Sequence, residues 1–272
     1  MDEIGGADKM KDKLSIIVYS CWKNRDMWEI FSKLFRKFWH DCPLQIILVT
    51  DTFQETGRPY IFTKIVQIDD TWAKMIKAAI KEAQTPYVSL WMDDYLLCDY
   101  VQNKDIDNQL RRAMKYNAAN LRLIESPPCQ GHWQRHKNIG CYRRGRAYSF
   151  ATQIGIWNSN FLVKTISDEW SAWDFERIAS LRKSTDCPED RQPILVALDY
   201  EFPYEEGVRK GKWMQQGAKL CRRNGIKLDT KVRPIMTNLE MAKIYFQGAV
   251  IDWNGTLVLQ IQNLMGKIKD GR

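Results

Sequence analysis

The chain has 272 residues, of which 44% are hydrophobic and 27% charged, and this composition is typical of a folded globular protein and excludes wholesale disorder. No apolar run approaches the roughly 20 residues of a membrane span, and the acidic residues within residues 1–13 argue against a secretory signal. The net charge of +8 predicts an anionic partner, such as nucleic acid, a lipid surface or a phosphorylated substrate.

After an N-terminal segment, residues 1–13, that we predict to be disordered, strands alternate with helices. Short apolar runs predict buried strands at residues 14–20, 44–50, 64–68 and 87–92. Helical spacing of apolar residues predicts one helix from an N-cap at Asp26 to Phe38 and another over residues 71–83. This alternation predicts an α/β fold with a mostly parallel sheet flanked by helices. In such sheets, ligands bind at the carboxyl ends of the strands.

Beyond Tyr95 the pattern is looser. The remaining predicted helices cover residues 103–116, 160–166, 171–181, 214–224 and 257–268, and the remaining strands cover residues 119–124, 150–157 and 194–200. Residues 126–149 contain two prolines, two histidines and five Lys or Arg residues, which predicts a long loop or hairpin.

Two adjacent carboxylates, Asp93 and Asp94, directly follow the strand at residues 87–92. Buried unpaired charge is costly, and carboxylate oxygens together with substrate phosphate are the ligands that Mg²⁺ and Mn²⁺ prefer. A divalent metal site is therefore one interpretation, and a solvated turn with two acids is the other. Ser20, Arg25 and Asp51 lie at the ends of other predicted strands, so we expect them near the same edge.

Several segments carry a resemblance to known enzymes. The run TPYVSLWMDDYL at residues 85–96 resembles the acidic metal motif of glycosyltransferases with the nucleotide-sugar-binding GT-A fold, although its two aspartates are adjacent instead of spaced as Asp-x-Asp. Residues 16–21 resemble the first strand and nucleotide loop of those enzymes, and Thr71-Trp72 fits as well. Residues 148–157, with Glu169 and the Trp-Asp-Phe-Glu block at 173–176, are similar to bacterial capsule and lipopolysaccharide glycosyltransferases.

The resemblance implies an organisation of the chain and a donor site. It implies a GT-A domain over residues 14–235, with a nucleotide-sugar half at about 14–100 and an acceptor half at about 101–235, followed by a C-terminal helical extension over 236–272. It further implies that Asp94 and Asp93 hold Mn²⁺ or Mg²⁺. The residues expected to bind the nucleotide-sugar, with a UDP-sugar favoured, are Ser20, Arg25, Asp51, Trp72 and Asp93.

An inverting transferase needs a carboxylate that deprotonates the acceptor hydroxyl, and we predict Glu169 for this role, with Asp168 second. The residues expected at the acceptor are Gln153, Trp170, Trp173 and Arg144. Structural alternatives stay open for this region. Asp174 and Glu176 suit a first helical turn, Asp168 or Ser171 suits an N-cap, and Trp173 suits the core.

Cys129, His132, His136 and Cys141 are zinc-ligand types at tolerable spacing. Their order and the short loop between them do not match a common zinc finger, so loop thiols and surface imidazoles are the other interpretation.

The chain contains no P-loop, no Gly-x-Gly-x₂-Gly and no Gly-x-Ser-x-Gly motif, which argues against an NTPase, a dehydrogenase and a serine hydrolase. We predict a metal-dependent glycosyltransferase that moves a sugar, with inversion, to a hydroxyl of a surface glycan or a lipid-linked acceptor. Two alternatives remain: a protein that binds single-stranded nucleic acid through basic stretches interleaved with aromatic residues, and a catalytically inactive module that binds nucleotide-sugars.

The positive charge is concentrated after the acid pair. Residues 209–233 contain nine Lys or Arg and one acid, and residues 130–149 contain five Lys or Arg and no acid. This placement points to a diphosphate, a phosphate-bearing acceptor or an anionic membrane face. The unpaired cysteines favour the cytoplasm, with peripheral contact at the inner membrane face through the helix at 257–268. Packing of that helix on its own domain or on a second protomer, giving a homodimer, is the alternative.

Overall fold

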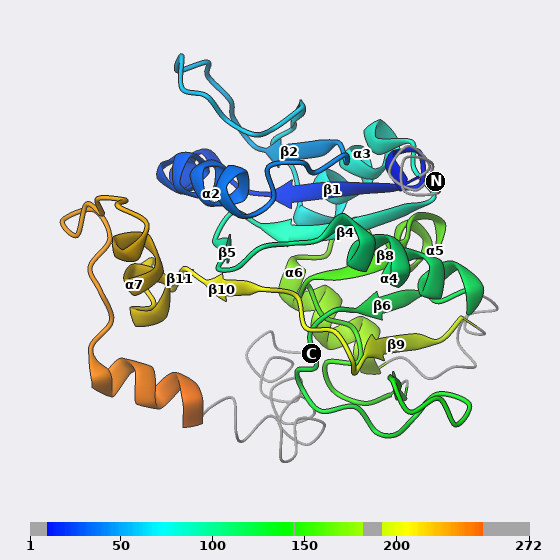
Figure 1. Ribbon diagram of the computed structural model, residues 1–272. Coiled ribbons are helices and arrows are strands. Elements are labelled where there is room, and N and C mark those ends of the chain that lie inside the picture. The colour runs from blue at the N-terminus through cyan, green and yellow to red at the C-terminus, as the bar shows by residue number, and fades with distance from the viewer. Residues whose placement is uncertain (1–9, 144, 182–191, 247–272) are drawn as a thin grey trace, which may run out of the picture.

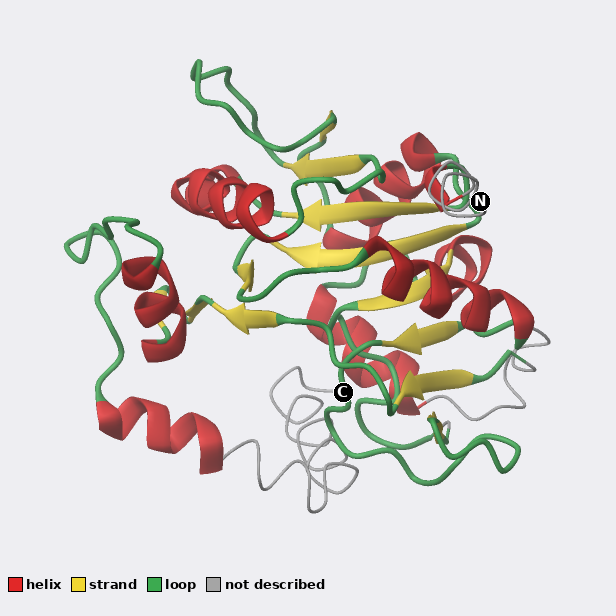
Figure 2. Ribbon diagram, in the orientation of Figure 1, coloured by secondary structure: helices red, strands yellow, loops and turns green. Residues whose placement is uncertain are grey.

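The computed structural model describes residues 10–143, 145–181 and 192–246, and its centre is an eight-stranded sheet in the order β3-β2-β1-β4-β8-β6-β9-β7 (Figures 1 and 2). The strands are β1 (Leu14–Tyr19), β2 (Ile46–Thr50), β3 (Lys64–Gln67), β4 (Tyr87–Met92), β6 (Asn120–Arg122), β7 (Ile139–Tyr142), β8 (Gly155–Asn158) and β9 (Ile194–Ala197). The pairings β3-β2, β2-β1, β1-β4 and β6-β9 are parallel, and β8 and β7 run against their neighbours.

Helices cover both faces of this sheet. They are α2 (Arg25–Phe38), α3 (Trp72–Ala83), α4 (Asn103–Lys115), α5 (Ser159–Thr165), α6 (Ala172–Asp174) and the π-helical turn η2 (Phe175–Ala179). Side chains alternate along a strand, so Ile16 packs in one core with α2 and α4, whereas Ile17 packs in the other with α3 and α5. The prediction of an α/β fold with a mostly parallel sheet flanked by helices is confirmed.

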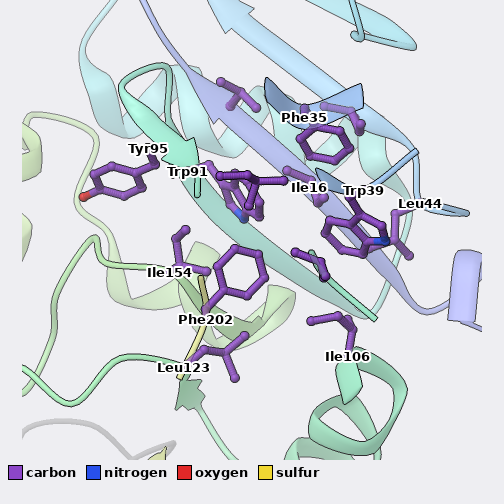
Figure 3. Packing of buried hydrophobic residues seen from close by; sticks show 14 of the residues in the cluster. Ile16, Phe35, Trp39, Leu44, Trp91, Tyr95, Ile106, Leu123, Ile154 and Phe202 are labelled. Carbon is purple, nitrogen blue, oxygen red and sulfur yellow. The ribbon is translucent and has the colours of Figure 1, made fainter. Parts of the chain in front are cut away.

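The first core is built from large aromatic side chains. Trp91 of β4 lies between Phe35 of α2 and Trp39, the C-cap of that helix, on one side and Phe202 on the other, with ring centroids 5.1–6.5 Å apart (Figure 3). Offset and edge-on ring contacts of this kind add to the free energy gained from burying apolar area. The end of β4 is thereby held rigidly against α2, which positions the residues that follow.

Two small ribbons join the sheet to the C-terminal part of the chain. β5 (Tyr95–Leu97) pairs with β10 (Tyr204–Glu206), and β11 (Val208–Arg209) pairs with β12 (Lys212–Trp213). Helix α7 (Gln215–Arg223) follows, and residues 238–246 are helical. In Figure 1, α7 and this last helix lie at the left of the molecule, apart from the large sheet. Among the described residues, no helix is both long and apolar enough to cross a membrane.

Some predicted elements differ from the observed ones. Asn24, not Asp26, occupies the N-cap position of α2, and the carboxylate of Asp26 pairs with Arg233 instead. The single helix predicted at 171–181 is the short α6 followed by η2, and the strand predicted at 150–157 is restricted to β8. The helix at 257–268, most of segment 1–13 and Arg144 lie outside the described residues.

Candidate functional site

A buried hydrogen-bonded chain links the end of β4 to the end of β1. The two strands are parallel neighbours in which Tyr19 pairs with Met92, so the next residues, Ser20 and Asp93, lie side by side. The Ser20 hydroxyl donates to Oδ2 of Asp93, and the indole Nε1 of Trp28 donates to Ser20 Oγ at 2.7 Å. The carboxylate of Asp93 is therefore oriented by the loop that follows β1, at the sheet edge where the sequence predicts that these strand ends converge.

Asp94 faces the segment between β10 and β11. The backbone amide of Val208 donates to its carboxylate, and the amide of Gly207 donates to its carbonyl at 2.7 Å. Burial raises the pKa of Asp94 to about 7, and the carboxylate of Glu206 adds to this shift. Burial, and then the charge of Asp94, raise the pKa of Asp93 well above its usual value. The two carboxyl groups thus lie close to one another and to Glu206, with little access to water.

Two arginines from the basic stretch 209–233 approach this acid pair. Arg233 is buried and donates to both carboxylate oxygens of Asp26, at 2.6 and 2.8 Å, while Arg209 donates to both oxygens of Glu206, at 2.6 and 2.5 Å. The charge of Arg233 lowers the pKa of Asp93, and that of Arg209 lowers the pKa of Asp94. The sequence located this charge only as a stretch, because nothing local distinguishes these two arginines from their neighbours.

The acid pair has no ion-pair partner among the described residues. Within residues 10–143, 145–181 and 192–246, no Lys, Arg or His forms an ion pair with Asp93 or Asp94, and no three His, Cys, Asp or Glu side chains are placed to hold a metal ion. Asp93 is buried and Asp94 half-buried, and carboxylates in such surroundings without an ion-pair partner are costly. A hard cation that uses one or two carboxylates and takes its other ligands from water and substrate phosphate would offset that cost.

The residues predicted to bind the nucleotide divide into two groups. Asp51 follows β2 on the same sheet edge, and its Oδ1 accepts the backbone amides of Trp22 and Thr52 at 2.6 and 2.7 Å. The guanidinium of Arg25 lies 4.6 Å from the centre of the Trp22 ring. Trp72, in contrast, is buried in the second core, where its ring centroid lies 5.4 Å from that of Phe175.

The two residues predicted as the base lie beside the start of α3. Asp168 and Glu169 are both exposed. Asp168 forms an ion pair with Lys77 at 2.5 Å, and its carbonyl accepts the hydroxyl of Thr71, the N-cap of α3. Asp168 is therefore already engaged by Lys77 and Thr71, whereas the carboxylate of Glu169 forms no ion pair with a described residue and acts on Lys74 through its charge.

The two tryptophans predicted at the acceptor have different surroundings. Trp170 is buried in the second core, whereas Trp173 is 69% exposed at the start of α6. Ser171 caps α6 and forms a reciprocal capping box with Asp174, so the structural alternative for these two polar residues is confirmed. Only Trp173 of this group is free to present a ring to a ligand.

Glu176 is held by polar contacts that its position in the sequence does not indicate. Its Oε1 accepts the backbone amide and the hydroxyl of Thr152 at 2.7 and 2.8 Å. Burial raises the pKa of this carboxyl. The charges of Glu176 and Asp94 both act on the hydroxyl of Tyr95, which points away from the aromatic core in Figure 3. The sequence suggested only a helix-start charge, since the contact with Thr152 depends on the tertiary fold.

Gln153 is engaged by a buried arginine. The guanidinium of Arg122, which is fully buried, donates to Oε1 of Gln153 and to the carbonyls of Ser126 and Tyr148. In the described structure, Gln153 therefore binds Arg122, and Thr152, the residue before it, binds Glu176.

The four candidate zinc ligands do not gather into a metal group in the part of the chain that is described. Cys129 and Cys141 are free thiols. The Nε2 of His136 lies 3.3 Å from the hydroxyl of Tyr116, with which its ring also packs. The structure thus favours the interpretation of loop thiols and a surface imidazole.

No protein-family model matches the sequence, and no curated protein matches it. Solved structures similar to this chain include S. aureus TarS, with 12% identity over 71% of this chain and 59% of that chain and a TM-score of 0.44. TarS has also been solved in complex with UDP-GlcNAc. A mannosyltransferase from Pyrobaculum calidifontis, in complex with GDP-Man and Mn²⁺, has 12% identity over 73% and 58% of the two chains and a TM-score of 0.40.

A cytidylyltransferase from Leptospira borgpetersenii has 10% identity over 83% of this chain and 98% of that chain, with a TM-score of 0.41. This chain spans about three fifths of the length of the TarS structure. Because each of these TM-scores lies below 0.5, we take the fold of this chain from its own strand order and its chemistry from the acid pair and the groups around it.

Proposed function

We propose that this chain is a metal-dependent GT-A glycosyltransferase that moves a sugar from a nucleotide-sugar donor to an acceptor hydroxyl. The observation that carries the proposal is the acid pair at the carboxyl end of β4, with Asp93 held by Ser20 of the adjacent strand end and without a cationic partner among the described residues. Asp51 lies beyond the next parallel strand at the same edge, where α/β sheets bind ligands.

Donor binding would use both sides of this edge. Asp51, Arg25 and Ser20 would contact the nucleoside, and a UDP-sugar is the favoured donor. Asp93 and Asp94 would hold Mn²⁺ or Mg²⁺, and when bound the ion would offset the charge of the departing nucleoside diphosphate. Arg209 and Arg233, each already paired with one carboxylate, are the nearby cations that would contact the phosphates.

Two carboxylates compete for the role of the base in an inverting displacement. Glu169 is exposed to solvent next to the N-terminal end of α3. Burial raises the pKa of Glu176. After burial, the charges of Asp94 and Glu176 both contribute to the raised pKa of Tyr95. A base is most effective when its pKa approaches the working pH. We therefore favour Glu176 and keep Glu169 as its competitor.

The acceptor would be a surface glycan, as in capsule or lipopolysaccharide synthesis, or a lipid-linked precursor in the cytoplasm. Trp173 would offer an aromatic face for a sugar ring, because its side chain is exposed close to Glu176 in the sequence. The exposed ring distinguishes it from Trp170, whose burial indicates a structural role.

Calorimetric titration with UDP-, GDP- and CDP-sugars, with and without Mn²⁺, tests the proposal. We expect one donor to bind and its affinity to depend on the metal. Asp94→Asn should remove the metal dependence, whereas Asp107→Asn, which changes an aspartate on α4 that pairs with Arg111, should retain it. Metal-independent binding of single-stranded nucleic acid without donor binding would overturn the proposal. Donor binding without any turnover would instead identify an inactive module.

A further inference from the structure

The C-terminal lobe, which we define as residues 214–246, is a small unit of α7, a loop and the helical residues 238–246. Met214, Met236, Met241 and Ile244 form its own apolar cluster. The amide of Gln216 donates to the hydroxyl of Tyr245, so the exposed side of α7 and the end of the last helix are neighbours. Figure 1 shows the lobe standing at one side of the molecule, beside the β10 and β11 segment.

Several large apolar side chains of the lobe are exposed. Val232 is 64% exposed, Leu239 68%, Tyr245 54% and Phe246 71%. Leu239 and Phe246 are seven residues apart and so share a face of the helix, opposite the face on which Met241 and Ile244 are buried. Single exposed apolar residues are ordinary, but a group of them on one unit marks an interaction surface.

The same lobe carries many exposed cations. Six basic residues of the lobe are exposed and form no ion pair with another described residue: Lys219, Arg222, Arg223, Lys227, Lys231 and Lys243. Only two acids, Asp229 and Glu240, lie in the lobe. Glu240 is paired with Lys212, and Asp229 accepts the backbone amides of Lys231 and Val232. The free charge of the surface is therefore almost entirely positive.

We propose that the C-terminal lobe docks on an anionic lipid surface. Its cations would lie at the headgroups, and Leu239 and Phe246 would enter the boundary between headgroups and acyl chains. A second copy of the chain would bring a like-charged surface against this one, which is unfavourable. Nucleic acid would pair with the cations but would offer no apolar contact to Leu239 and Phe246.

The lobe contacts Gly207, whose amide is hydrogen-bonded to the backbone of Asp94. Met214 donates its amide to the carbonyl of Gly207 at 2.8 Å, and Gly207 donates to Asp94. Docking would consequently hold the site of Asp94 near the bilayer, where lipid-linked molecules are found. The docking proposal itself does not depend on the proposed transferase activity, and its test uses no donor and no acceptor. It also uses other residues than the helix predicted at 257–268.

Sedimentation of the full chain with vesicles tests the proposal. We expect no binding to vesicles of phosphatidylcholine alone, and binding to vesicles that also contain phosphatidylglycerol, weakening as salt is added. A Lys219→Gln, Arg222→Gln, Arg223→Gln variant should bind roughly 100-fold more weakly, since each cation at the surface contributes about fivefold. A Leu239→Ser, Phe246→Ser variant should also lose binding, even at low salt.

The matched control removes the same charge elsewhere. Lys81, Lys104 and Lys115 are exposed on α3 and α4, and their replacement by Gln should leave vesicle binding unchanged. Equal loss in the control, or no binding to phosphatidylglycerol vesicles, would overturn the proposal. The proposal would also be overturned if the protein does not bind vesicles but forms a dimer that Phe246→Ser dissociates. Nucleic-acid binding that needs the three cations but not Leu239 and Phe246, without vesicle binding, would also overturn it.

Discussion

At the scale of single residues, Asp93 and Glu176 show how burial makes a carboxylate useful. Asp93 accepts from Ser20, which follows β1, and Ser20 accepts from the indole of Trp28 in α2, so two side chains set the position of the carboxylate. Glu176 is held by Thr152, which donates from both its amide and its hydroxyl. An acid that is already held in this way loses little conformational entropy when a ligand binds, which is a common property of active sites.

Glu176 allows a prediction of pH dependence. Its pKa is raised by burial, so the carboxylate form that a base needs is lost at a higher pH than for an ordinary glutamate as the pH falls. We expect the turnover rate to fall on the acid side through this raised pKa, and Glu176→Gln to lower it about 100-fold or more with donor affinity kept. Rates across pH and calorimetric donor affinities provide the measurement.

The competing variant is Glu169→Gln, which replaces an exposed carboxylate of the same size. It should leave both the rate and its acid limb unchanged. If Glu169→Gln removes turnover while Glu176→Gln keeps it, the base is Glu169 and the role of Glu176 is to hold residues 148–152 against η2.

At the scale of elements, strands with strong apolar runs are recognisable in the sequence, whereas short ribbons are not. The four strands β1 to β4 match their predicted ranges within two residues. β5 and β10 are three residues each, too short for alternation to be visible, and each exists because the other supplies its hydrogen bonds. The turn η2 is π-helical, and the spacing of apolar residues that predicts an α-helix does not predict this geometry.

The contact between α7 and the ribbon depends on two glycines. A Cβ on Gly217 would lie 2.7 Å from the Cα of Gly207 and 3.0 Å from its carbonyl oxygen, and both atoms belong to backbone. We expect Gly217→Ala to destabilise the protein by about 1–3 kcal/mol, because overpacking forces α7 away from the ribbon. Urea unfolding measures this change.

Lys219→Ala, on the exposed side of the same helix, is the control and should change the unfolding free energy by no more than a few tenths of a kcal/mol. An unchanged midpoint for Gly217→Ala would show that α7 can move away from Gly207 without cost.

At the scale of the whole molecule, one ion pair joins the two ends of the described chain. Arg233 donates to both oxygens of Asp26, 207 positions away, and also to Asn24 at 2.8 Å. This contact fixes the C-terminal lobe onto the start of α2, next to the loop that follows β1. Burial raises the pKa of Asp93, and the charge of the same arginine opposes that rise, so the lobe and the acid pair are linked by charge as well as by packing.

Arg233→Ala should therefore loosen the lobe. We expect a loss of about 2 kcal/mol, typical of hydrogen bonds to a charged group, with faster amide exchange in residues 224–246 and little change in β1 to β4. Hydrogen exchange with mass spectrometry measures both regions. Arg58→Ala removes a more exposed ion pair with Glu29 and should cost less than about 1 kcal/mol. Equal effects of the two variants would contradict this account.

The sequence by itself determined the α/β class, the edge at which Ser20, Asp51, Asp93 and Asp94 meet, and the basic character of residues 209–233. These follow from local patterns, since apolar runs form buried strands and parallel strands end at one edge. The tertiary structure decided which distant groups complete the site. Arg233 pairs with Asp26 across 207 positions, and Glu176 accepts from Thr152 across 24 positions. Trp72 and Trp170 are buried in the second core because large rings gain most from burial.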